Sequence, residues 1–323
     1  MRERSARPWG IRFYDASPEL KFELAVIAPF GLNSQYRNDR IGRYQAIKSN
    51  IETTNVNPNI VYRVSDWLSI GGGPAIQYAT AELTNAINST TVARRANRLL
   101  PAGLTRPERL YPSHRDSLSV GYNLGAFAEI SPRTRFGASY RSQVSHRLDG
   151  TAILRVPAPL SADQRFQNTP TGTDLNTPDI VSLAASHEIS ADLTLTAEIQ
   201  WTNGSAARNL RVERPYGSAL IHQREHARNM VRQRGASYGA DQKWIIRGGF
   251  AFDPTPIPNQ FRTARLPDAK RDWLALGIGY KSRVDLRFDA ANVHNLPRKC
   301  ANRRVWSTGD LIVGCGAATL RCE

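Results

Sequence analysis

The chain alternates apolar and polar residues over long stretches, and this two-residue period is its dominant pattern. The stretch 192–201 reads DLTLTAEIQW, with Leu, Leu, Ala, Ile and Trp on one side of an extended chain and Thr, Thr, Glu and Gln on the other. The stretches 119–130 and 135–148 follow the same rule. Successive side chains of a β-strand point to opposite faces, so each stretch predicts a strand with one apolar and one polar face.

The predicted strands are long, and the connections between them alternate in length. Several strands run about 10 to 16 residues, whereas strands of globular proteins usually have about 5–6. About ten residues tilted at ~45° cross the apolar core of a bilayer. Short turns are expected near 64–66, 131–133, 190–192, 239–242 and 281–283, and long loops at 32–42, 84–118, 150–178, 203–235 and 253–272. Short turns at one rim and long loops at the other are typical of outer-membrane barrels.

These patterns predict an all-β protein, an antiparallel up-and-down transmembrane β-barrel. About eleven or twelve strands are expected before Asn292 and no helical domain is visible, although the loop 93–111 has room for short helices. The polar residues at alternate positions suit a lumen, whereas soluble barrels fill that face with apolar side chains. The alternative that this pattern leaves open is a large soluble antiparallel sheet with one solvent-exposed face.

One predicted strand contains residues that usually interrupt strands. Residues 68–79 read LSIGGGPAIQYA, and the apolar register is the same before and after the Gly-Gly-Gly-Pro at 71–74. We therefore interpret the stretch as one strand with a bulge or kink at Pro74, which cannot donate a ladder hydrogen bond. The tiny inward residues are expected to leave room in the lumen for a ligand or a plug. The predicted lumen-facing positions are Gly71, Gly73, Gln77 and Phe127.

Composition adds a large positive charge without pointing to nucleic acid. The chain has 323 residues, a net charge of +15 and a mean hydropathy of −0.44. It has no run of 18 apolar residues, so it offers no transmembrane helix candidate. The charge is concentrated in the short segments 1–12, 223–234 and 298–323. Arginines also cluster in the loop 94–115, but no nucleic-acid-binding motif accompanies them, and lipopolysaccharide phosphates would explain them equally well.

The residues that carry catalytic or metal chemistry form no recognisable site. All three cysteines lie in the last 24 residues and form no CxxC pair, so no metal site is expected. His222 and His226 are four apart but lack an HExxH motif, and no G-x-S-x-G elbow is present. His146 and His187 fall on the apolar face by parity, where we interpret them as rim residues. We predict no catalytic residue and no enzyme, and an outer-membrane lipid hydrolase stays the enzyme alternative.

Three stretches together resemble a known family, the FadL-type outer-membrane transporters of long-chain fatty acids and aromatic hydrocarbons. They are APFGLNSQYRNDRIGRYQAIKSNIETTNVNPNIVYRVSDWLSIGGGPAIQYATAEL at 28–83, PRTRFGASYRSQVSHRLDG at 132–150 and FDPTPIPNQFRTARLPDAKRDWLALGIGYK at 252–281. The resemblance extends over roughly residues 13–286 with one gap. Each short motif is unspecific alone, and their order makes the set specific.

The resemblance implies a barrel of 14 strands with an N-terminal hatch, in the outer membrane of a Gram-negative bacterium. It implies capture of a long-chain fatty acid or other hydrophobic compound at the outer loops 84–118 and 150–178, then passive passage through the barrel wall. It implies no cofactor, and we expect a monomer in contact with outer-membrane lipid and lipopolysaccharide. A general porin is the main alternative within this class. By position in the first loop, the candidate ligand contacts are Leu99, Leu100, Leu104, Leu110 and Tyr111, which could equally pack the loop on itself.

Several departures from the family pattern lead to a further hypothesis. The chain shows no signal peptide, hatch or closing aromatic strand, so we expect residues 1–291 to form an incomplete barrel. The alternation is lost in the Arg-rich segments 220–235 and 292–323, which we interpret as aberrant and as products of frameshifted translation. We therefore expect the polypeptide as printed to be a fragment that does not assemble into a competent transporter.

Overall fold

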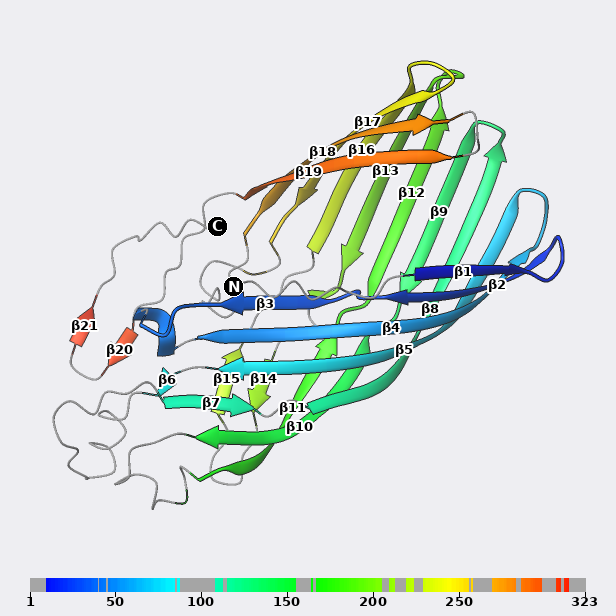
Figure 1. Ribbon diagram of the computed structural model, residues 1–323. Helices are drawn as coiled ribbons and strands as arrows, with labels where there is room; N and C mark the ends of the chain where they lie inside the picture. Colours follow the sequence, from blue (N-terminus) through cyan, green and yellow to red (C-terminus); the bar gives the residue numbers. More distant parts are fainter. Residues whose placement is uncertain are drawn as a thin grey trace.

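The computed structural model is built almost entirely of antiparallel β-strands (Figure 1). It describes residues 10–39, 41–44, 46–84, 86–87, 108–112, 115–154, 164, 167–204, 209–212, 219–223, 229–255, 257, 269–282, 286–297, 306–308 and 311–313. Among these residues, the 3₁₀ turn η1 (Ile41–Tyr44) interrupts the strands. Within these residues, no helix has the length and apolar character needed to cross a bilayer.

One sheet of 13 strands dominates the molecule. Its strands are β1 (Gly10–Asp15), β2 (Leu20–Ile27), β3 (Gly31–Gln35), β4 (Lys48–Arg63), β5 (Leu68–Thr84), β8 (Arg115–Ser131), β9 (Thr134–Arg141), β12 (Ile180–Glu188), β13 (Leu193–Thr202), β16 (Asn229–Gly239), β17 (Trp244–Asp253), β18 (Arg271–Lys281) and β19 (Arg287–Pro297). They pair in that order, except that β3 continues beside β4 where β2 ends.

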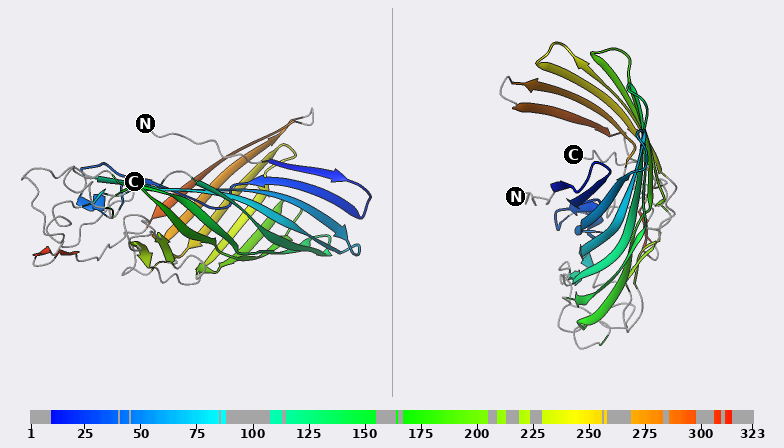
Figure 2. Two further views of the ribbon diagram at one scale, coloured as in Figure 1. Left: turned by 90° about the horizontal axis from the view of Figure 1, so that it is seen from below. Right: turned by 90° about the vertical axis from the view of Figure 1, so that its right-hand side faces the viewer.

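The sheet curves into a trough whose two edges, β1 and β19, have no ladder partner beyond them among the described strands (Figure 2, right). The predicted all-β, up-and-down antiparallel architecture is therefore confirmed, and the described barrel is open. Strands β4, β5 and β8 have 16 or 17 residues, long enough to cross a bilayer at a tilt.

Short turns join the strands at one rim, as the alternation of loop lengths predicts. In the turn between β16 and β17, Asp241 Oδ1 accepts hydrogen bonds from the backbone N–H groups of Lys243 and Trp244, each at 2.7 Å. These bonds hold the pKa of Asp241 below its usual value. Such side-chain-to-backbone bonds are the usual reason for Asp in a tight turn.

The opposite rim carries the long connections, and part of what the sequence predicts as loop is strand. The predicted loops 84–118 and 150–178 contribute strands to a second sheet, of order β11-β10-β7-β6. The strands outside the barrel sheet are β6 (Ala86–Ile87), β7 (Glu108–Pro112), β10 (Val144–Leu154), β11 (Thr169–Thr177), β14 (Asn209–Val212), β15 (Ala219–Gln223), β20 (Trp306–Thr308) and β21 (Leu311–Val313).

The two faces of the barrel sheet differ as the alternation predicts. Along one cross-strand row, Phe136, Ala185, Ala197 and Phe250 point outward with other exposed apolar side chains. One residue further along each strand, the inward row carries small and polar groups, including Gly137 and Glu198. An exposed apolar outer face and a polar inner face suit a barrel surrounded by lipid.

The structure differs from the sequence expectation at two segments. Strand β16 begins inside the segment 220–235, and β19 runs beyond residue 291. Both strands place polar residues on the outer face: Arg232 and Arg234 in β16, Asn292 and His294 in β19. Outward apolar residues return at Ala236 and Tyr238. The barrel sheet therefore includes part of both segments, while their interpretation as aberrant and the frameshift hypothesis stay predictions.

Candidate functional site

The inner face of the sheet forms a cavity of about 800 Å³. Small and apolar residues from β2, β5, β8, β9 and β12 line much of it, and asparagine, serine, arginine and glutamate side chains supply the polar part. The residues used below are Ala25, Gly71, Gly125, Phe127, Gly137, Ala184, Asn57, Asn59, Asn123, Ser139, Ser182, Arg141 and Glu198. Such a mixture can hold an apolar molecule and orient its polar end.

The three glycines of β5 let the backbones of the neighbouring strands β4 and β8 approach β5 closely. A Cβ on Gly73 would collide with the Pro58 carbonyl oxygen, and one on Gly71 would lie 3.0 Å from the Ile60 carbonyl oxygen. On the other face, a Cβ on Gly72 would lie 2.6 Å from the Asn123 carbonyl oxygen. The β4 backbone therefore lies close to Gly71 and Gly73. Gly71 still lines the cavity, and the expectation that these glycines leave room for a ligand stays a prediction.

The ladder between β4 and β5 is interrupted beside these glycines. Backbone pairing stops at Val56 and Ile76 and resumes at Ile60 and Gly72 in the same register. In that register the two prolines of the interrupted stretch, Pro58 and Pro74, face each other. Neither has an N–H group to donate. The ladder between β4 and β5 is thus interrupted at the two prolines without a shift of register, so no bulge is present there, and a kink at Pro74 stays a prediction.

A second irregularity lies between β2 and β3, where the register against β4 shifts by one residue. Ile27 pairs with Asn55, whereas Gly31 pairs with Glu52. In the intervening segment, the Phe30 N–H donates to Thr53 Oγ1 at 3.0 Å, and the Thr53 hydroxyl donates to the Phe30 carbonyl at 2.8 Å. The pairing of β4 with its neighbours is therefore irregular at two places, and Pro29, Asn57 and Asn59 from this part of the wall line the cavity.

Gln77 points inward as predicted but does not line the open cavity. Its side chain is fully buried, and its Oε1 lies 2.8 Å from Nε2 of His146. After Ser142 the chain leaves the barrel wall, and β10 lies over β8 and β5, since a Cβ on Gly121 would touch Val144 at 2.7 Å. His146 is therefore a buried partner of Gln77, and its interpretation as a rim residue is wrong.

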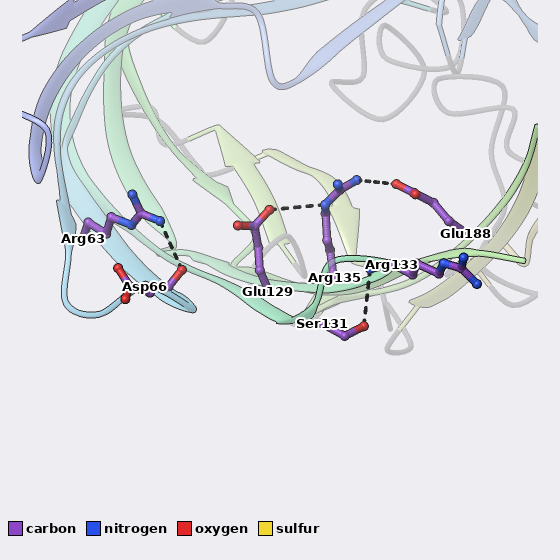
Figure 3. Close-up of polar contacts among 7 residues, drawn as sticks. All are labelled: Arg63, Asp66, Glu129, Ser131, Arg133, Arg135 and Glu188. Atoms are coloured by element: carbon purple, nitrogen blue, oxygen red, sulfur yellow. Dashed lines mark hydrogen bonds and ion pairs between the residues drawn. The ribbon is translucent and has the colours of Figure 1, made fainter. Parts of the chain in front are cut away.

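A group of charged residues lies on the inner side near the short-turn rim (Figure 3). Arg135 contacts Glu129 at 3.3 Å and Glu188 at 3.1 Å, and Arg63 donates to the Asp66 carbonyl at 3.2 Å. Phe127 lies next to Glu129 along β8 and lines both the main cavity and a smaller one of about 510 Å³. Phe127 thus faces the lumen in the structure.

Of the five outer-loop candidates, the structure describes the backbones of two. Leu99, Leu100 and Leu104 lie outside the described residues. Leu110 and Tyr111 belong to β7, where their backbones pair with Leu154 and Ile153 of β10. The structure therefore neither brings the five candidates together nor separates them.

Two arginines of β9 that were not singled out as site residues from the sequence are prominent in the lumen. Arg135 and Arg141 both have inward parity, together with Gly137 and Ser139. Their alternation with Phe136, Ala138 and Tyr140 is visible in the sequence and was the available signal. Their partners, which lie on two other strands, β8 and β12, are visible only in the fold. Among the described residues, no three side chains gather as metal ligands.

Sequence comparison supports the same class of protein. Residues 11–307 match the family model "Outer membrane protein transport protein (OMPP1/FadL/TodX)". The long-chain fatty acid transport protein of Escherichia coli O6:H1 is 23% identical over 283 residues, covering 82% of this chain and 64% of the relative. Outer membrane protein P1 of Haemophilus influenzae is 26% identical over 298 residues, covering 87% and 64%. The chain thus spans about 64% of the length of these relatives.

Solved structures show the same fold. A Pseudomonas aeruginosa FadL homologue superposes with a TM-score of 0.81 at 22% identity, covering 92% of this chain and 71% of that one. The Ralstonia pickettii toluene transporter TbuX gives a TM-score of 0.66 at 18% identity, covering 90% and 75%. With the family model matching most of the chain, this protein belongs to the OMPP1/FadL/TodX family of outer-membrane transport proteins.

Proposed function

We propose that this protein takes up long-chain fatty acids or other hydrophobic compounds passively across the outer membrane. The relatives are named as transporters of long-chain fatty acids and of toluene, which makes a hydrophobic small molecule the natural cargo. The observation that carries the proposal is the lumen cavity of about 800 Å³, bordered by Ala25, Gly125, Phe127 and Ala184 inside a barrel whose outer face is apolar.

Burial of apolar surface supplies the driving force for entry. Each methylene group removed from water gains about 0.8 kcal/mol. We propose that the outer loops 84–118 and 150–178 capture the ligand first, with Leu99, Leu100, Leu104, Leu110 and Tyr111 as candidate contacts. The ligand then moves into the lumen cavity. No cofactor takes part, and the barrel acts as a monomer with outer-membrane lipid and lipopolysaccharide around it.

The exit that fits this barrel best is sideways into the membrane. The charged residues at the short-turn rim oppose passage of an apolar molecule along the axis, because stripping water from charged groups is costly. The pairing irregularities at Phe30 and at Pro58–Pro74 adjoin the cavity, since Pro29, Asn57 and Asn59 line it, and the wall there lacks some of its ladder bonds. We propose this part of the wall as the route out.

Uptake by cells that lack other fatty acid channels tests the proposal. Cells producing the chain should accumulate labelled palmitate and should not gain uptake of a small labelled sugar. A general porin would show the opposite preference, and the Arg135 cluster (Arg135 with Glu129 and Glu188) is the kind of charged group that lines a selective pore. Sugar uptake without palmitate uptake would therefore replace the proposal with the porin alternative.

A further inference from the structure

Two arginines of β16, Arg232 and Arg234, face outward where the outward residues of β13 and β17 are apolar. In the ladder Ile199 lies beside Arg232, and Phe250 lies beside Arg234. Both arginine side chains are exposed, and among the described residues neither has a carboxylate partner. Arg232 contacts the sulfur of Met230 at 3.7 Å. Unpaired charges on the lipid-facing side of a barrel are destabilising, so these two call for a physical explanation.

Arg234 borders an apolar groove of about 650 Å³ on the outer face of the sheet. A Cβ on Gly248 would meet no atom within 4 Å, so the outer face is open over this part of β17. A groove of this volume lies in the range of small-molecule sites, about 300–1,000 Å³. Other outward residues that line it are Ala185, Leu195, Ala197, Ala236, Phe250 and Leu276. A flexible hydrocarbon chain fits such a surface.

The depth of the two arginines matches the outer leaflet of the membrane. Trp201 of β13 pairs with Met230 of β16 beside the long connection between these strands, and an outward Trp is typical of the membrane interface. Arg232 lies two residues from that pair, ~7 Å along the strand. An arginine stem can extend over this distance and bring its guanidinium to the interface. Arg234, at the middle of β16, lies two residues deeper, where the groove begins.

We propose that Arg232, Arg234 and the groove form an outer-wall site for one lipopolysaccharide molecule of the outer leaflet. Its phosphates bind the two arginines, and one of its acyl chains lies in the groove. The lipid carries its phosphates at the interface and its acyl chains below them, so its charged and apolar parts follow the same order as the site. Guanidinium groups form paired, charge-assisted hydrogen bonds with phosphate.

The charges around the site favour an anion. One acid, Asp272 of β18, faces outward in the row of Arg232, but Phe252 and one strand spacing separate them. Two arginines against one carboxylate leave a net positive charge. Zwitterionic phosphatidylcholine offers no net anion, so in its vesicles the arginines lower stability, whereas lipopolysaccharide offsets that cost. The frameshift hypothesis gives these arginines no partner, so the two explanations make different predictions.

Binding of fluorescent lipopolysaccharide to the full chain, purified in a non-ionic detergent, tests the site. The unaltered protein should bind it at least about tenfold more tightly than the same lipid after removal of its phosphates. The double variant Arg232→Gln, Arg234→Gln should lose that difference. The matched control is Lys243→Gln, Lys281→Gln, which removes two cations near the short-turn rim and should keep it. Gly248→Leu, which fills the groove, should weaken binding of both forms of the lipid.

Equal binding of the two forms by the unaltered protein, or an unchanged difference in the double arginine variant, overturns the site. An equal loss in the lysine control also overturns it, as does phosphatidylglycerol that binds as tightly as lipopolysaccharide. Unchanged binding by Gly248→Leu overturns the place of the acyl chain. If the glutamine variant fails to fold, Arg232→Lys, Arg234→Lys decides: it should keep part of the difference, and its absence overturns the inference. Each of these results leaves uptake of hydrophobic compounds standing.

Discussion

At the residue scale, the glycines at 71–73 show where sequence reasoning succeeds and where it ends. Alternation alone assigns Gly71 and Gly73 to the inner face, and the ladder with β8 places them there opposite Gly125 and Asn123. The sequence cannot show that β4 bends over the same glycines, because the bend arises from Pro58 on another strand. The small residues allow close strand packing at these positions, and Gly71 also lines the cavity.

Gly73→Ala should destabilise the barrel strongly, although it adds only one methyl group. The added Cβ would meet the Pro58 carbonyl oxygen and the Asn59 side chain, and the backbone there cannot move without shifting β4. Overpacking of this kind costs about 1–3 kcal/mol. Gly248→Ala is the control, since a Cβ there meets nothing within 4 Å. Urea unfolding in lipid vesicles measures the difference, and equal stability of the two variants would contradict the close approach of β4.

Arg232 and Arg234 should be replaceable by leucine with a gain in stability. Both point outward, Arg232 opposite Ile199 and Phe252, and Arg234 opposite Ala197 and Phe250. An arginine facing lipid costs about 2–4 kcal/mol at the bilayer midplane and about 0–1 near its surfaces. Unfolding of the double variant in vesicles should therefore need more denaturant. Arg247→Leu, which removes an inward arginine paired with Asp289, should instead lower stability.

At the element scale, the departure of β10 from the barrel wall is the main feature that alternation does not reveal. Apart from Ser142 and His146, the sequence keeps a two-residue period from 135 to 148, which predicts one continuous strand. The structure divides it into β9 and β10 at Ser142, whose hydroxyl accepts a hydrogen bond from the Tyr122 N–H at 2.8 Å. The period is the same in both strands, so only the tertiary packing shows the change of sheet.

Lowering the pH should weaken the packing of β10 against the barrel, because His146 is buried there. Burial lowers the pKa of His146 in the folded protein. The unfolded or undocked state therefore takes up a proton first, and the docking free energy falls as pH drops below the ordinary histidine pKa of about 6.5. Hydrogen exchange of β10 and β11 amides, corrected for intrinsic rates, should accelerate between pH 7 and 5. His146→Gln should remove this dependence, and an unchanged profile would show that another group controls it.

At the scale of the whole molecule, two simple sequence features were sufficient for the architecture. Alternation gave the strands and their faces, and the contrast between short and long connections gave the up-and-down order. The cavity could not be predicted in the same way, because Arg141, Asn123, Ile180 and Glu198 are brought together by pairing across four strands. The expectation that the printed polypeptide is a non-competent fragment stays a prediction.

The two faces of β18 give the sharpest test of the membrane barrel against a soluble sheet. Leu276 points outward and is 61% exposed, while its neighbour Ala275 points inward in line with Gly249 and Gly235. With Cys300, Cys315 and Cys322 replaced by serine, Ala275→Cys should react with a water-soluble maleimide in outer-membrane fractions. Leu276→Cys should react only after detergent removes the lipid, because hydrocarbon excludes the charged reagent. A soluble sheet would react at the outward, more exposed position without detergent, so equal labelling of both cysteines in intact membranes would exclude the barrel arrangement.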